Sequence, residues 1–252
     1  MSDFDRNVAA RGGFADRAAA VDAGLRAYML RVYNYMAAAV ALTGVVAYAT
    51  FNAAVVTDAS GKITALTPFG QTIFSGPLSI VLLLGTLGLV FFISFRINRL
   101  QYTTAMTLFM LYAALLGVTL SSIFLAYTGA SITRVFFISA ASFGALSLYG
   151  YTTQRDLSAM GSFMIMGLFG IIIASLVNIF LKSSGLDWAI SVIGIGVFAG
   201  LTAWDTQRIK EMYDSMDDDG TMGRKAIMGA LSLYLDFINL FLMLLRVVGD
   251  RR

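Results

Sequence analysis

Long hydrophobic runs alternate with short polar connections along the whole chain. Each run approaches or exceeds the roughly 20 residues that a helix needs to cross a bilayer. The hydrophobic residues are continuous within the runs rather than alternating with polar ones, which predicts helices and not the strands of an outer-membrane barrel. The runs are Val32–Ala53, Pro77–Phe95, Thr103–Tyr127, Val135–Tyr151, Gly161–Leu181, Trp188–Trp204 and Ala226–Val248. The expected fold class is an all-α membrane protein, a bundle of seven transmembrane helices.

The polar segments divide the chain into three parts. Residues 1–31 are expected to form a cytoplasmic tail with an amphipathic lead-in helix, although a solvated tail explains residues 1–20 equally well. Residues 32–248 form the transmembrane domain and residues 249–252 a short tail. No early apolar core of a cleavable signal is present in the first 31 residues. The connection Asn52–Gly76 is the longest outside the membrane and is expected to be irregular.

The last hydrophobic run carries an acidic residue, Asp236, at its middle. An aspartate at the bilayer centre costs about 2.5 to 3.5 kcal/mol, so it must face protein or water rather than lipid. At 3.6 residues per turn, Ser232, Asp236 and Asn239 share one stripe of the helix. This run is therefore predicted to have a polar seam. A buried aspartate that only bonds serine or asparagine on a neighbouring helix is the structural alternative.

A second carboxylate, Asp205, lies near the end of the sixth run, three residues before Arg208. Runs six and seven should be antiparallel neighbours, and Asp205 and Asp236 reach a similar height if run six extends to about Tyr213. Two close carboxylates in a dry site cannot both ionise cheaply, so they share a proton. The pair is predicted to sense pH and, when deprotonated, to bind a hard cation such as Ca²⁺. Alternatively, Asp205 is an interfacial residue that pairs with Arg208.

Composition narrows the possible chemistry. The chain is 58% hydrophobic and 13% charged, with no cysteine and no histidine. Thiol nucleophiles, Ser-His dyads and zinc sites built on thiolate or imidazole are thereby excluded. Carboxylates, amides and carbonyls remain, and these favour protons and hard cations. We expect no enzymatic function and no cofactor, with H⁺ and Ca²⁺ as the sensed or transported ions. A net charge of +3 suits basic membrane loops and does not predict a nucleic-acid partner.

The distribution of basic residues predicts an orientation. Counting across seven spans, 12 of the 18 lysines and arginines lie on the side of the N-terminus. The positive-inside rule then places the N-terminus in the cytoplasm and the C-terminus outside. The expected location is the inner membrane of a bacterium. Arg251 and Arg252, at the opposite end, oppose this assignment.

Two strings of the sequence resemble the signature of the Bax inhibitor-1 family. They are GLTAWDTQRIK, which ends run six, and SLYLDFINLFLMLLR in run seven, and the resemblance extends over residues 25–249. It implies six helices around a central seventh and a pH-sensitive Ca²⁺ leak governed by an aspartate pair, which falls on Asp205 and Asp236. The family's basic latch on helix two falls on Arg99 in an ungapped match and on Arg96 if a short gap is allowed. The loops after runs one and six are longer than the family pattern, which leaves loop-dependent regulation open.

Other functions are compatible with parts of the pattern. A non-transporting scaffold that binds membrane proteases or partner helices is the main alternative, and proton-coupled transport of a small solute is another. An intramembrane aspartyl protease is disfavoured because Asp236 does not follow a GxGD motif and neither proline lies after residue 77. The acidic run 214–219 fails the EF-hand spacing, since Ala226 stands where the bidentate glutamate should be. It is expected to be a solvated loop, with weak cation binding as the alternative.

Overall fold

The computed structural model describes residues 3–58 and 62–252, with side chains from Val21 onward. In this described part, seven helices are long and apolar enough to cross a membrane, as the sequence predicts. The elements in chain order are α1 (Asp3–Ala54), β1 (Val55–Thr57), β2 (Ile63–Leu66), α2 (Pro68–Phe74), α3 (Pro77–Arg96), η1 (Ile97–Arg99), α4 (Tyr102–Leu120), α5 (Ile123–Ala126), α6 (Gly129–Thr152), α7 (Ser158–Leu181), α8 (Ser184–Glu211) and α9 (Asp219–Val248).

Local sequence explains where several of these helices begin. Three of the long helices start at a side chain that accepts hydrogen bonds from free N–H groups of the first turn. These caps are Thr128 for α6, Ser183 for α8 and Asp218 for α9. Pro77 occupies the first position of α3, where its missing N–H costs nothing. Lys182 ends α7 in the left-handed conformation, with φ of 49°, and so turns the chain back within two residues.

The connection after α1 is not irregular, so that expectation is wrong. Strands β1 and β2 pair in an antiparallel hairpin, with Val55 opposite Leu66, and α2 follows. Both strands are rich in β-branched residues, which favour extended backbone. The Thr67 side chain then accepts a hydrogen bond from the N–H of Gly70 at 3.0 Å and starts α2.

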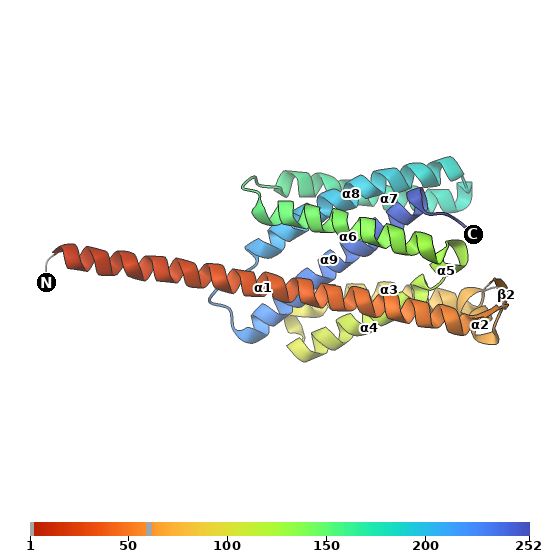
Figure 1. Ribbon diagram of the computed structural model, residues 1–252, viewed down its shortest axis with the longest axis horizontal. Coiled ribbons are helices and arrows are strands. Elements are labelled where there is room, and N and C mark those ends of the chain that lie inside the picture. The colour runs from red at the N-terminus through yellow and green to blue at the C-terminus, as the bar shows by residue number, and fades with distance from the viewer. Residues whose placement is uncertain (1–2, 59–61) are drawn as a thin grey trace.

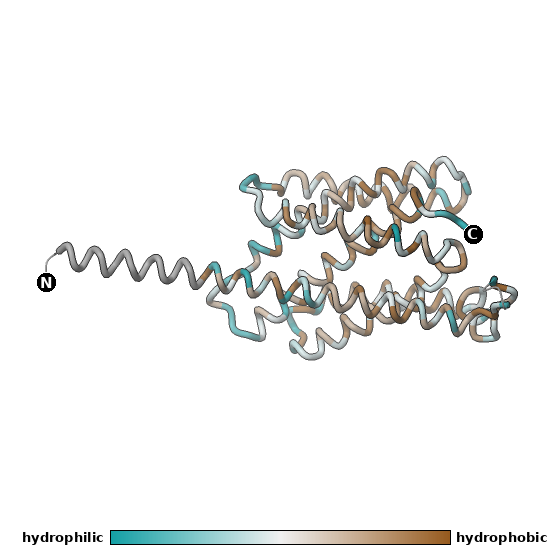
Figure 2. The backbone as a smooth tube through the Cα atoms, viewed as in Figure 1, coloured by the Kyte–Doolittle hydropathy of each residue, from teal (hydrophilic) through white to brown (hydrophobic). Residues whose placement is uncertain are grey.

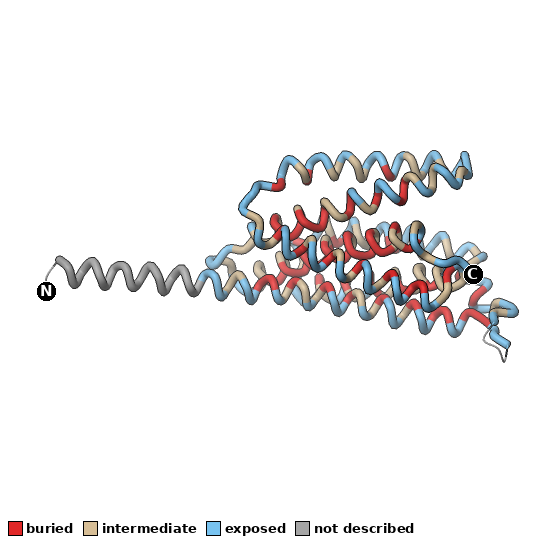
Figure 3. The backbone as a smooth tube through the Cα atoms, turned by 45° about the horizontal axis from the view of Figure 1, so that its top comes forward, coloured by how far each residue is buried: buried red, intermediate tan, exposed pale blue. Residues whose placement is uncertain are grey.

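Helix α9 lies at the centre of the bundle, as the family resemblance implies. Figure 1 shows α6, α7 and α8 on one side and α1, α3 and α4 on the other, with α9 running obliquely between them. Buried residues make up 67% of the most hydrophobic window of α9, against 11% for α3 and 6% for α7. In Figure 3 the buried positions gather along the middle of the bundle, and exposed ones cover its outer faces. Figure 2 shows hydrophilic residues concentrated at the connections and at the C-terminal end.

Tyr234 fixes α9 to the layer that contains α1 and α4. Its ring meets Phe109 and Tyr112 of α4 edge to face, at centroid distances of 5.8 and 5.9 Å. Its hydroxyl lies 2.6 Å from Oγ1 of Thr43 in α1. The Thr43 proton goes to a backbone carbonyl, of Ala39 or Ala113, so the tyrosine must be the donor.

Candidate functional site

Helices α8 and α9 approach each other through glycines on both sides of the predicted aspartate pair. A Cβ added to Gly229 of α9 would lie 3.0 Å from Cγ2 of Ile209, and one added to Gly194 of α8 would lie 3.0 Å from Cγ of Met243. Small residues let helix backbones come close within a membrane. Because the two contacts lie on either side of it, the stretch of α8 that carries Asp205 is held close to α9.

Asp205 and Asp236 meet in this stretch. The two carboxyl groups lie within hydrogen-bonding range of each other. The residues are 7% and 5% exposed, so neither carboxylate is solvated by bulk water. Burial removes the hydration that stabilises a charge, and two like charges at this range repel. One proton shared by the pair relieves both penalties.

Arg208 is the cation of this site. Its NH2 lies 3.1 Å from Oδ1 of Asp205, one helical turn away on α8, and it donates a longer hydrogen bond of 3.4 Å to Oγ of Ser232 on α9. The guanidinium also stacks over the Trp204 ring, 4.9 Å from its centroid. The arginine therefore ties α8 to α9 beside the carboxylates. In the structure Asp205 lies beside Asp236 and also pairs with Arg208, so the two interpretations of this residue are compatible.

Unpartnered polar atoms gather at this site. In the described part of the chain, four buried side-chain atoms lack a hydrogen-bond partner, and three of them are Asp205 Oδ1, Asp236 Oδ2 and Arg208 Nε. The 3.1 Å contact of Asp205 Oδ1 with Arg208 is an ion pair without the geometry of a hydrogen bond. Two ionised carboxylates and one guanidinium leave one negative charge without a counter-charge. A proton between the carboxyl groups cancels that charge and gives an oxygen a partner. One proton on the pair therefore balances the charges of this site.

Comparisons with known proteins identify the family. A family model described as inhibitor of apoptosis-promoting Bax1 matches residues 25–252. The chain belongs to the Bax inhibitor-1 family. It is 53% identical over 231 residues to the protein RP147 of Rickettsia prowazekii, with 92% of each chain covered. It is 48% identical over 232 residues to the inner membrane protein YbhL of Escherichia coli, covering 91% of this chain and 94% of YbhL. A protein of Caulobacter vibrioides is 43% identical over the full length of both chains.

Arg96 and Arg99, the two latch candidates of this Bax inhibitor-1 family member, lie apart from the pair. Arg96 ends α3 and Arg99 lies in η1, and both residues are exposed. Neither forms an ion pair within the part of the chain that the structure describes. The cation that reaches Asp205 comes from α8 itself. A latch role for either arginine stays a prediction.

The other two seam residues of α9 take different partners. Ser232 accepts the hydrogen bond from Arg208, whereas Nδ2 of Asn239 donates to the carbonyl of Leu235 on its own helix at 2.8 Å. Ser232 therefore belongs to the charged site. Asn239 satisfies part of its polar side chain locally, one turn beyond Asp236.

A chain of hydroxyl groups that ends at Thr206, the sequence neighbour of Asp205, was not predicted from the sequence. Tyr33 of α1, Ser147 of α6 and Thr206 of α8 are linked by hydrogen bonds of 2.9 and 2.8 Å. Thr206 donates to the carbonyl of Thr202, so Ser147 must donate to Thr206 and Tyr33 to Ser147. The only available signal was Thr206, next to Asp205 in the family string. Its partners come from helices whose positions the sequence did not reveal.

The acidic loop between α8 and α9 is structured by its own carboxylates. Asp217 pairs with Lys225 at 2.6 Å, so the expectation of a wholly solvated loop is only partly met. Asp218 accepts from Thr221 and from the N–H of Gly220, and these bonds hold the pKa of its carboxyl below its ordinary value. The described part of the chain contains no group of three or more acidic residues placed to hold a metal ion.

Proposed function

We propose that the protein is a pH-sensitive cation leak pathway of the bacterial inner membrane, with Ca²⁺ as its cargo and the Asp205–Asp236 pair as its proton-sensing gate. The single observation that carries this proposal is the buried carboxylate pair with one arginine. Intramembrane carboxylates are costly and typically mark ion pathways. The similarity to YbhL, an inner membrane protein, supports the location, and the basic residues support a cytoplasmic N-terminus.

Charge balance provides the gating step. With a proton on the pair, Arg208 neutralises the remaining carboxylate and the site carries no net charge. When the proton leaves, one negative charge remains beside Ser232 and the hydroxyl chain. A cation that reaches the site can then take the place of the proton. Protons and Ca²⁺ therefore compete for the same two carboxylates, which makes the flux depend on pH.

The ligand set suits a transient Ca²⁺ site. Calcium takes 6 to 8 oxygen ligands, and two carboxylates supply at most about four. The remaining ligands would be water, hydroxyls or backbone carbonyls. Conduction requires binding that is strong enough for entry but weak enough for release, so an incomplete site favours passage over storage.

The described conformation corresponds to the closed state of this mechanism, because packed side chains enclose the pair. Helix α3 is the candidate moving element. It packs against α4, α2 and η1 at the edge of the bundle, and only 11% of its most hydrophobic window is buried. Few buried contacts make local displacement inexpensive. Its terminal Arg96, and Arg99 in η1, would then act as the latch if opening brings them near the pair.

The proposal is tested by Ca²⁺ flux into liposomes that contain the purified protein, across roughly pH 5 to 8. Wild type should show a flux that depends on pH, and Asp205→Asn and Asp236→Asn should each flatten the dependence. Asp187→Asn is the matched control, because Asp187 lies on the same helix at the opposite end and pairs with Arg246 at 3.6 Å. Absence of wild-type flux above empty liposomes would refute the leak and leave the scaffold interpretation.

A further inference from the structure

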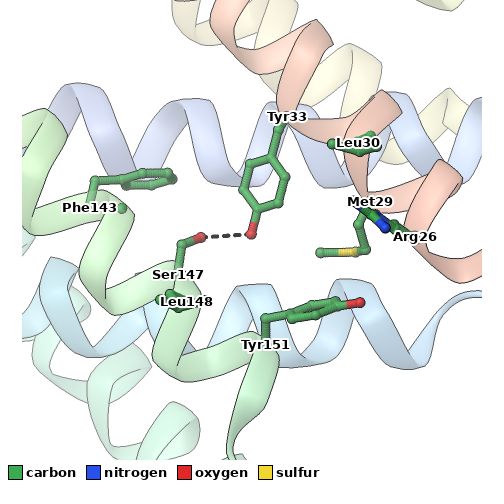
Figure 4. A pocket seen from close by; sticks show the side chains of 9 residues that line it. Arg26, Met29, Leu30, Tyr33, Phe143, Ser147, Leu148 and Tyr151 are labelled. Atoms are coloured by element: carbon green, nitrogen blue, oxygen red, sulfur yellow. Dashed lines mark hydrogen bonds between the residues drawn. The ribbon is translucent and has the colours of Figure 1, made fainter.

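An apolar groove runs between α1 and α6, and α9 lines part of its length. In the part of the chain that the structure describes, the backbones of α1 and α6 do not pack closely as those of α1 and α4 do. Three cavities of about 560, 340 and 330 Å³ lie along the gap. The first two share Tyr33 and Phe143, and the second and third share Phe136 and Phe237, so they join end to end. Figure 4 shows the first of them.

The groove is as long as a bilayer is thick. On α1 its lining begins at Arg26 and continues to Ala47. At 1.5 Å per residue this stretch measures about 31 Å, close to the roughly 30 Å of a hydrocarbon core. Leu30 and Leu148 on its rims are 54% and 63% exposed. In a membrane the groove therefore opens sideways onto acyl chains.

The wall of the groove offers little to water. Near Arg26 its side-chain hydroxyls belong to Tyr33, Ser147 and Tyr151, and the first two point toward each other in Figure 4 and are bonded at 2.9 Å. Tyr33 donates its proton to Ser147, and Ser147 donates its proton to Thr206. Neither hydroxyl therefore has a proton left to donate to water. Beyond Tyr33 the lining of the second cavity is otherwise apolar. A buried water needs two to four polar partners, which that stretch does not provide, whereas a hydrocarbon chain needs none.

One end of the groove is cationic. Arg26 lines it there, and Lys210 lies beside it, with Nζ 5.3 Å from the centroid of the Tyr151 ring and donating to the Tyr151 carbonyl at 3.0 Å. Neither cation forms an ion pair among the described residues, although Asp22 lies one turn from Arg26. The opposite end, near Phe124 and Phe241, is lined by no charged residue.

We propose that this groove binds a phospholipid with an anionic headgroup, from the leaflet on the Arg26 side. The phosphate would lie beside Arg26 and Lys210, and an acyl chain would follow Tyr33, Phe143 and Phe237 over α9. A transmembrane helix of a partner protein is too wide for this position. A helix with its side chains is about 10 to 12 Å across, and the Tyr33–Ser147 bond already bridges the two walls. The bound lipid would cover the gap between α1 and α6, where the hydroxyl chain runs from Tyr33 to Thr206 of α8.

Gly144 provides the decisive variant. It lines the first cavity, and a Cβ added there meets no atom within 4 Å. Gly144→Leu therefore places a side chain in the first cavity at a position where the Cβ has room. Gly170→Leu is the matched control, because Gly170 is also an exposed mid-helix glycine with nothing within 4 Å, but it lies on α7, away from the groove. Circular dichroism and gel filtration should first establish that both variants fold.

The test is native mass spectrometry of the detergent-purified protein, titrated with phosphatidylglycerol or phosphatidylcholine of identical acyl chains. We expect wild type and Gly170→Leu to retain one lipid with preference for phosphatidylglycerol, and Gly144→Leu to lose it. Arg26→Ala should lower the affinity for phosphatidylglycerol about fivefold and that for phosphatidylcholine less, because the choline ammonium offsets the charge of its phosphate. Arg155→Ala, an exposed arginine at the same end of the bundle, should behave as wild type.

Equal lipid retention in wild type and Gly144→Leu would overturn the proposal. So would an equal loss of affinity for both lipids in Arg26→Ala. A photo-crosslinker at Leu148 in intact membranes should yield lipid adducts, and a single protein adduct in their place would assign the groove to a partner helix. None of these measurements depends on Ca²⁺ flux, so the lipid site and the leak can fail separately.

Discussion

The Arg208 guanidinium lies 3.1 Å from the carboxylate of Asp205 and carries the only positive charge in contact with the pair among the described residues. Its side chain is 41% exposed, whereas that of Asp205 is 10% exposed. The arginine thus connects a buried acid with the surface of the bundle. Its removal changes the charge balance of the site and leaves both carboxylates in place.

Arg208→Gln should lower the apparent Tm at pH 8 and have little effect at pH 5. Without the guanidinium, ionised carboxylates have no counter-charge, whereas a protonated pair needs less of one. Because Arg208 is partly solvated, the loss at pH 8 should be only about 1 kcal/mol. Thermal unfolding in detergent at both pH values measures it, with Arg155→Gln as the control. An equal loss at the two pH values would show that Arg208 acts by packing on Trp204.

Asp236→Asn should raise the apparent Tm at pH 8. The variant removes the buried negative charge that Arg208 does not reach, and the asparagine amide can donate to Asp205. The gain should vanish near pH 5, where the wild-type pair holds its proton. The same melts test this, with Asp187→Asn as a control whose partly exposed ion pair contributes little. Destabilisation at both pH values would contradict the proposed charge balance.

Gly229→Ala should destabilise the protein even though alanine favours helix. The added Cβ would lie 3.0 Å from Cγ2 of Ile209, which is fully buried and cannot move freely. Overpacking costs about 1 to 3 kcal/mol, more than the roughly 1 kcal/mol that alanine gains in helix propensity. Gly170→Ala, which meets nothing, should be neutral or stabilising. The cost of Gly229→Ala should shrink in an Ile209→Ala background, and a cycle without such coupling would refute the assigned contact.

Hydrophobic patterning predicted the seven spans because length and continuity of apolar residues are properties of each segment alone. It did not place the start of α6, which lies at Gly129 rather than Val135, or the ends of α8, which extends by several residues on both sides of the run Trp188–Trp204. Polar residues at those ends are tolerated once caps such as Thr128 satisfy the backbone. The hairpin after α1 was missed because its two strands are only three and four residues long.

The part of the candidate site that lies on consecutive helices, the aspartate pair, was predictable from the sequence. A polar connection joins α8 and α9, so the two aspartates could be expected at one height. The sequence did not show which arginine pairs with Asp205. Arg96, Arg99 and Arg208 all lie near the same end of the bundle, and only packing determines which one reaches the carboxylate. The Tyr33–Ser147–Thr206 chain joins three helices that are distant in sequence, and no local pattern places them together.

Asp218 should make the start of α9 sensitive to acid. Its hydrogen bonds with Thr221 and Gly220 depress its pKa below the ordinary 3.8. The cap therefore stabilises the helix end at pH values above 3.8 and is lost as the pH falls through the depressed pKa. Hydrogen exchange should show the amides of Gly220 and Thr221 losing protection over that window. Asp218→Asn keeps a good cap without the pH dependence, whereas Asp218→Ala loses protection at every pH.

Thr43→Val should be more damaging than Tyr234→Phe. Tyr234 donates to Thr43, while the Thr43 proton reaches a backbone carbonyl, so the threonine variant leaves a buried tyrosine hydroxyl without its acceptor. An orphaned buried donor costs about 1 to 3 kcal/mol, whereas removal of the tyrosine hydroxyl leaves the threonine proton bonded. The double variant should cost less than the sum of the single ones, because no donor is then orphaned. Melts of the four proteins measure the cycle, and strict additivity would show that the 2.6 Å contact contributes no coupling between α1 and α9.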